Sequence, residues 1–163
     1  MKKLLWIMPF IVLFLSACSS ESKENYTQML GAFERNDNEL NTMLNETAEN
    51  ISSESNREKA LKSINEDIIP RVTDFRQTIN NYTLSDEQHV EVQEAMIDYL
   101  NEVEDLMELY SNFNEEFFFV NPLGDDSIDK KLNGALDQIS TQEEDMEEAK
   151  DHVNQLIGDN EEE

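Results

Sequence analysis

The sequence predicts an all-α protein, an elongated antiparallel up-down-up-down four-helix bundle with coiled-coil-like packing. Three observations support this fold class. Apolar residues recur in alternating steps of three and four from residue 26 to residue 157, no stretch alternates with the period of two that marks a strand, and the breaks between periodic segments are short. Short connections make consecutive helices antiparallel. A three-helix bundle with one loosely packed extra helix is the alternative.

The chain begins with the features of a secretory signal. Lys2 and Lys3 precede an apolar run, residues 4–15, that is shorter than the roughly 18 residues a membrane span needs. The run ends in Leu15-Ser16-Ala17-Cys18, and Cys18 is the only cysteine in the sequence. These four residues resemble the lipobox of bacterial lipoproteins, and the composition, rich in Asn, Glu and Ile, is typical of a low-GC Gram-positive source.

The resemblance to lipoproteins implies that residues 1–17 are a signal peptide and that Cys18 is the lipidation site, carrying diacylglycerol and acyl groups such as palmitate. Two or three buried acyl chains hold a protein durably on a bilayer. We therefore expect a protein anchored to the extracytoplasmic face of the cell membrane, with residues 18–23 as a short tether. No other cofactor is expected.

Four periodic segments make up the expected bundle domain, residues 24–157. A spacing that averages 3.5 residues is typical of helices that pack side by side with a left-handed supercoil. The polar members of the pattern indicate imperfect packing or positions that flank a groove. The recurring positions are Tyr26, Leu30, Phe33, Asp37, Leu40, Leu44, Thr47 and Ile51; Leu61, Ile64, Ile68, Val72, Phe75, Ile79 and Tyr82; Val92, Met96, Tyr99, Val103, Leu106, Tyr110, Phe113, Phe117 and Val120; and Ile128, Leu132, Ala135, Ile139, Gln142, Met146, Ala149, Val153 and Leu156.

The breaks between the segments have the chemistry of helix ends. Residues 52–56 are polar and separate the first two helices. Ser85, with Gln88 three residues later, predicts a capping box at the start of the third helix, and residues 121–124, which include a proline and a glycine, end it. Pro70 interrupts the second segment, but the apolar pattern stays in phase across it, so we expect one kinked helix rather than two.

The chain is strongly acidic, with 37 Asp and Glu against 12 Lys and Arg and a net charge of −25. Such a surface excludes nucleic-acid binding, because affinity for phosphate backbones comes mainly from basic residues. Of the four helical segments only residues 57–83 have no net negative charge, so we expect this second helix between the first and third, where it relieves their repulsion. The acidic run 158–163 predicts a disordered tail.

No motif marks an active site or a metal site. His89 and His152 are the only histidines, and neither belongs to the Glu-x-x-His arrangement of di-iron bundles. No EF-hand loop and no nucleophile with a neighbouring base can be identified. We therefore expect no catalytic residues, no metal and no enzyme activity, and we expect His89 to pack within the bundle.

Three consecutive phenylalanines end the third periodic segment. Phe117 continues the apolar pattern, whereas Phe118 and Phe119 fall on the outward side at the membrane-distal tip. Exposed aromatic pairs often mark contact surfaces, so these two residues are candidates for contact with a partner. In the alternative, both rings fold under the turn that follows.

The helical, acidic body is similar in character to the YkyA-type lipoproteins, described as cell-wall binding, and residues 105–110, Asp-Leu-Met-Glu-Leu-Tyr, are the most similar stretch. This resemblance implies an envelope protein, although an acidic surface opposes binding to anionic wall polymers. We expect a non-enzymatic interaction or scaffold module with an envelope-protein partner. A binding protein for cations or cationic peptides is the alternative.

Overall fold

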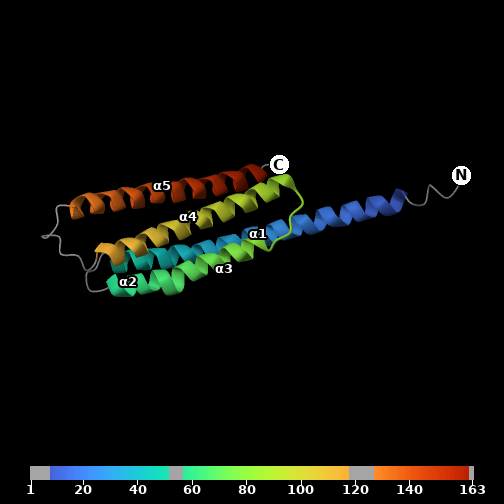
Figure 1. The fold of residues 1–163 in the computed structure, drawn as a ribbon. Coiled ribbons are helices and arrows are strands. Elements are labelled where there is room, and N and C mark those ends of the chain that lie inside the picture. The colour runs from blue at the N-terminus through green and yellow to red at the C-terminus, as the bar shows by residue number, and fades with distance from the viewer. Residues whose placement is uncertain (1–7, 52–56, 118–126, 162–163) are drawn as a thin grey trace.

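The computed structural model describes residues 8–51, 57–117 and 127–161, which are helical except for short connecting residues and contain no strand. Figure 1 shows four rods that alternate in direction, so the predicted all-α antiparallel bundle is confirmed. The helices are α1 (Met8–Ile51), α2 (Arg57–Ser63), the π-helical turn η2 (Ile64–Ile68), α3 (Ile69–Asn80), α4 (Glu87–Phe117) and α5 (Ile128–Glu161). Because α2, η2 and α3 follow one another without a break, they form a single rod.

The four rods are not packed equally. α1 packs against α2 and α3, α3 packs against α4, and α4 has its most extensive contact with α5. Within the described ranges no comparable backbone approach joins α1 to α5. The bundle is therefore open along the line between its first and last helices.

The core is built mainly by the first three rods. In α1 the buried residues include Met29 and Ala32 beside the predicted Phe33 and Leu40, because the buried face of this helix is wider than a strict heptad seam. Among the described residues of α5 only Ile139 and Val153 are buried hydrophobic side chains. The last helix thus lies along α4 without being embedded in the core. The largest fully buried side chains are Tyr99, Phe75, Met29, Leu40, Ile64, Ile68, Ile79, Met96, Leu100, Val72, Val92 and Val103.

The second rod passes Pro70 through a local change of helix type. The N–H of Ile69 donates to the carbonyl of Ile64, five residues back, which defines the π turn. An α-helix would require an N–H that proline lacks and would bring its ring against the preceding turn. The wider turn places Pro70 in the first turn of α3, where no such bond is needed. The expectation of one continuous helix is met, and the π turn is what accommodates the proline.

The start of α4 differs from the predicted capping box. The Oδ1 of Asp86 accepts hydrogen bonds from the N–H groups of Gln88, at 3.0 Å, and His89, at 3.4 Å, so Asp86 caps the helix. Ser85 donates its backbone N–H to the Oγ of Ser22 in α1, at 3.0 Å. The prediction of Ser85 as the cap is wrong by one residue, because Ser85 is held by the neighbouring helix.

Two terminal segments also differ from expectation. Residues 18–23, expected to be a tether, lie within α1, and the side chain of Ser22 is already buried against the bundle. Residues 158–161, expected to belong to a disordered tail, are the last residues of α5, where Asn160 donates to the carbonyl of Leu156 at 2.8 Å. In both places helical hydrogen bonding continues beyond the apolar pattern from which the boundaries were drawn.

The position of the second rod follows the expected distribution of charge. Arg71 on α3 bonds to Asn36 and Glu39 of α1, whereas Arg76 on the same helix bonds to Asn101 and Glu104 of α4. The two arginines thus reach in opposite directions toward the two acidic neighbours of α3.

Candidate functional site: the opening between α1 and α5

The opening between α1 and α5 is crossed at its middle by a polar bridge, formed by Asp37 and Asn41 of α1 and Lys150 of α5. The Nζ of Lys150 lies 3.0 Å from Oδ2 of Asp37 and 3.4 Å from Oδ1 of Asn41. The side chain of Asp37 is 15% exposed and that of Lys150 is 32% exposed, so water reaches this ion pair only in part. Lys150 is the single described basic residue that bonds across the opening.

Tyr99 connects the polar bridge to the core. Its hydroxyl, carried on α4, donates to Oδ1 of Asp37 at 2.9 Å, and Nζ of Lys150 lies 5.3 Å from the centre of its ring. Burial raises the pKa of Tyr99 well above its usual value, and the negative charge and hydrogen bond of Asp37 raise it further. Three helices therefore meet at one neutral phenol, one carboxylate and one ammonium group.

On the side of the bridge away from the N-terminus, the opening widens into a hollow of about 540 Å³, here called the distal hollow. Its volume lies within the range of ligand-binding clefts. The floor is apolar and comes from η2 and α4, while α1 and α5 form the two walls. The lining residues are Leu44, Asn45, Thr47, Ala48, Ile64, Leu106, Met107, Tyr110, Glu143, Met146 and Glu147.

A hydrogen bond from the hydroxyl of Tyr110 on α4 to Oε1 of Glu143 on α5 marks one edge of the distal hollow. Partial burial raises the pKa of Tyr110, and its bond to the Glu143 carboxylate raises it further. The same two residues also line a second hollow of about 360 Å³, here called the side hollow, which lies between α4 and α5. Its remaining lining residues are Phe113, Asn114, Leu136, Ile139 and Ser140.

Two carboxylates stand among the apolar side chains on the α5 wall of these hollows. Glu143 and Glu147 are one helical turn apart, and neither forms an ion pair with a described lysine or arginine. Helix α4 contains no lysine or arginine at all. Leu136, on the same side of α5, is 46% exposed, and it is the large hydrophobic residue that stands out on the described surface. An apolar floor thus lies beside unneutralised negative charge.

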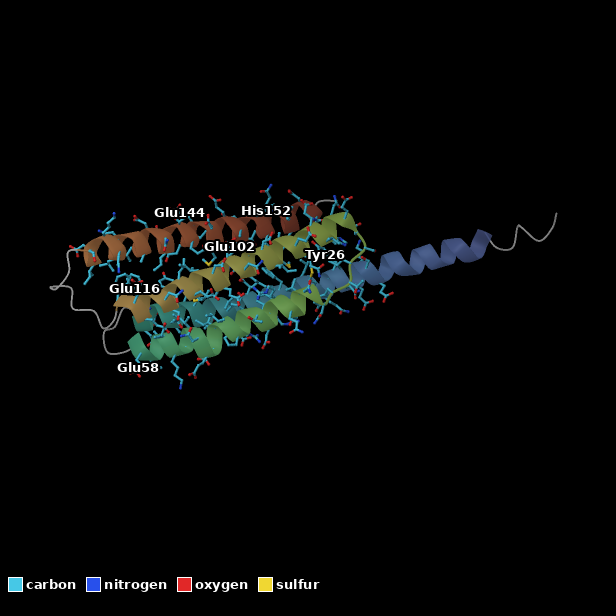
Figure 2. The ribbon with its side chains drawn as sticks, in the orientation of Figure 1. Tyr26, Glu58, Glu102, Glu116, Glu144 and His152 are labelled. Atoms are coloured by element: carbon cyan, nitrogen blue, oxygen red, sulfur yellow. The ribbon has the colours of Figure 1, made fainter. Side chains whose placement is uncertain are left out.

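On the other side of the polar bridge, toward the N-terminus, lies a hollow of about 430 Å³. Tyr26 of α1, labelled in Figure 2, stacks on the ring of His89 with the ring centres 3.7 Å apart. The predicted packing role of His89 is therefore confirmed. Lys23 and Asp86 both line this hollow, so its charges are mixed, unlike those of the distal hollow.

The remaining sequence-based site predictions have different outcomes. Cys18 lies within α1, whereas Phe118 and Phe119 lie outside the described residues. Among the described side chains, no group of three or more His, Cys, Asp and Glu is arranged to hold a metal ion. His152 is exposed on α5, where Figure 2 labels it.

The sequence pattern singled out some residues of this site but not the residues of other helices that they contact. Asp37 and Thr47 were predicted to be polar positions that disturb packing or flank a groove, and they form the bridge and line the distal hollow. Gln142, the third such residue, donates to Glu102 of α4 instead. Lys150 carried no periodic signal, and only its rarity as a cation on an acidic helix could have drawn attention to it.

No family model, no curated protein and no solved structure matches this chain. None of the described helices has an apolar stretch long enough to cross a membrane.

Proposed function

We propose that this protein is a non-enzymatic interaction module, anchored by a lipid on Cys18 to the extracytoplasmic face of the cell membrane, that receives an envelope partner in the opening between α1 and α5. The distal hollow carries this proposal. A four-helix bundle that had only to fold would bury the inner faces of all four helices, whereas α5 here contributes only two buried hydrophobic side chains in its described range.

The anchor is supported by the sequence and is compatible with the position of α1. The lipobox-like residues 15–18 immediately precede the part of α1 that enters the bundle, and Figure 1 shows α1 projecting beyond the other helices at this end. Ser22, one helical turn after Cys18, is the first described side chain that is buried. A lipid on Cys18 would therefore hold the bundle directly beside the membrane surface.

The anchor is tested by radiolabelled palmitate incorporation and membrane fractionation of the full chain and of its Cys18→Ala variant. We expect label and membrane association in the unaltered chain, and loss of the label together with retention of the uncut precursor in the variant. Equal labelling of both proteins would contradict the anchor.

The binding role is tested by placing a photo-crosslinking amino acid at Leu136 of α5 in intact cells, because this exposed residue lines the side hollow, which meets the distal hollow at Tyr110 and Glu143. A matched position is Gln77, which is exposed on α3 away from the opening. We expect a discrete adduct from position 136 and none from position 77. Identical adducts at both positions, or no adduct at either, would contradict an interaction at this site.

A further inference from the structure

We infer that the distal hollow and the side hollow together form one docking surface for a cationic amphipathic helix. This inference rests on the proposed function and names the class of its partner. The two hollows share Tyr110 and Glu143, so they lie on either side of the hydrogen bond between these two residues and no other side chain of the described bundle is needed to connect them. Along α5 they run from Leu136 to Glu147, a length of about 16 Å at 1.5 Å per residue. That length matches about three turns of a second helix.

The apolar part of the surface suits side chains spaced along one face of a helix. Leu106 and Met107 contribute to the floor of the distal hollow and Met146 to its α5 wall. Leu136 and Ile139 line the side hollow. Methionine side chains adapt to irregular partner surfaces. Grooves between helices commonly bind an amphipathic helix through residues three, four and seven positions apart. Each of the two hollows could receive one apolar side chain from the same face of a docked helix.

The negative charge beside the two hollows favours a positively charged partner. Glu143 and Glu147 stand on the α5 wall, and α4 beside them carries acidic but no basic residues. Lysines flanking the apolar face of a docked helix would meet these carboxylates, whereas an acidic partner would be repelled. A second copy of this chain carries a net charge of −25 and is disfavoured for the same reason.

The inference is tested by measuring peptide binding to the full chain in nanodiscs made of zwitterionic lipids. Empty nanodiscs measure how much of the peptide enters the lipid by itself. The probe is a labelled 18-residue Leu/Lys peptide with helical periodicity. A Leu/Glu peptide with the same apolar face and a scrambled Leu/Lys peptide of the same composition are the comparisons. At 150 mM salt we expect a Kd in the low micromolar range for the Leu/Lys helix and at least tenfold weaker binding of both other peptides.

Two pairs of substitutions locate the site. Glu143→Gln with Glu147→Gln removes two charges from the wall of the hollow, and Glu144→Gln with Glu148→Gln removes two charges at the same spacing on the neighbouring, exposed face of α5. We expect at least tenfold weaker binding from the first pair and less than twofold from the second. Circular dichroism checks that both variants remain folded.

The possible outcomes separate this inference from the proposed function. If both pairs of substitutions weakened binding of the Leu/Lys helix equally, the attraction would come from the overall negative charge and the inference would be overturned. Equal binding of the scrambled peptide and the Leu/Lys helix would overturn it as well. If the crosslinker at position 136 joined two copies of the chain, the occupant of the surface would be a second copy of this protein, and the inference of a cationic helix would be wrong. If the Leu/Lys peptide fails to bind while position 136 still captures a different protein in cells, the inference falls and the proposed function stands.

Discussion

Tyr99 shows how one side chain can make the stability of the bundle depend on pH. The folded state raises its pKa above the usual value of 10, whereas the unfolded chain exposes the phenol to water. Below pH 10 both states keep the proton and the unfolding free energy is unaffected. Above pH 10 the unfolded chain loses the proton first, so the unfolded state is favoured increasingly as the pH rises.

We predict that the unfolding free energy falls above pH 10 by about 1.4 kcal/mol per pH unit from Tyr99 alone. Tyr110 adds a smaller contribution, because it is only half-buried. Urea denaturation followed by circular dichroism between pH 9 and pH 11.5 measures the slope. Tyr99→Phe should lower it by about that amount, and an unchanged slope would show that Tyr99 is not the titrating group.

Individual residues also show what the sequence can and cannot predict. Asp37 stood out because it breaks an apolar pattern, and that anomaly was visible in the sequence. Its partners were not, since Tyr99 and Lys150 are 62 and 113 residues away and are brought to it only by the order in which the helices pack. Sequence periodicity fixes which face of a helix turns inward, but it does not specify which polar residues meet there.

At the scale of helices, Asp86 fixes where α4 begins. It accepts two backbone N–H groups that otherwise have no partner in the first turn, and its charge is favourable at a helix N-terminus. Asp86→Ala should cost about 1 kcal/mol of unfolding free energy. Ser85→Ala keeps the backbone bond to Ser22 and should change stability by less than about 0.5 kcal/mol. Thermal denaturation of the two variants measures both losses of stability. If Ser85→Ala lowered the stability more than Asp86→Ala, Ser85 rather than Asp86 would be the cap of α4.

The π turn makes a second prediction about a single helix. In a regular α-helix an interior proline costs about 3 kcal/mol, so replacing it should restore that amount. Because η2 already accommodates Pro70, we expect Pro70→Ala to change the unfolding free energy by no more than about 1 kcal/mol. A gain near 3 kcal/mol in urea denaturation would show instead that the proline strains the rod.

Some boundaries of the helices could be predicted, because they depend on local signals. The break after α1 follows from the polar residues 52–56, and the start of α5 at Ile128 coincides with the first position of the fourth apolar pattern. The extension of α1 toward its N-terminus and of α5 to Glu161 could not be predicted from apolar periodicity. Helical hydrogen bonds can continue through polar residues that bury nothing.

At the scale of the whole molecule, the second rod holds two acidic neighbours together. Arg71 and Arg76 bond to opposite sides, and the chain has few other cations to take their place. We predict that reversing both arginines to glutamate lowers the unfolding free energy by about 1–2 kcal/mol at 20 mM salt, because two attractions become repulsions. At 0.5 M salt the loss should be less than half as large, since screening shortens the range of the charges.

The matched control for this prediction is Lys59→Glu with Lys62→Glu. It makes the same change in net charge on the exposed surface of α2, where Lys62 pairs only with Glu66 of its own rod among the described residues. We expect a clearly smaller loss from the control pair. Equal losses from both pairs, or a loss from the arginine pair that does not depend on salt, would mean that total charge rather than position governs stability.

The fold class was predictable because a long apolar periodicity leaves few alternatives to packed helices. The opening between α1 and α5 was not, because closure of a bundle depends on how the fourth helix sits against the first. The sequence left two alternatives, a full bundle and a three-helix core with a loose fourth helix. The structure combines features of both, since α5 lies along α4 while few of its described side chains are fully buried.

In the proposed lipid-anchored state, the continuity of α1 would set the height of the docking surface above the bilayer. From Cys18 to Leu44 the chain is one helix, so the two residues are about 40 Å apart along its axis. Repulsion between anionic lipid headgroups and this acidic protein would favour an upright stance of a bundle that is held by the proposed lipid on Cys18. In that orientation a partner embedded in the lipid bilayer would not reach the docking surface. Only a molecule that approaches from the wall side, or that stands on a stalk of its own, would reach it.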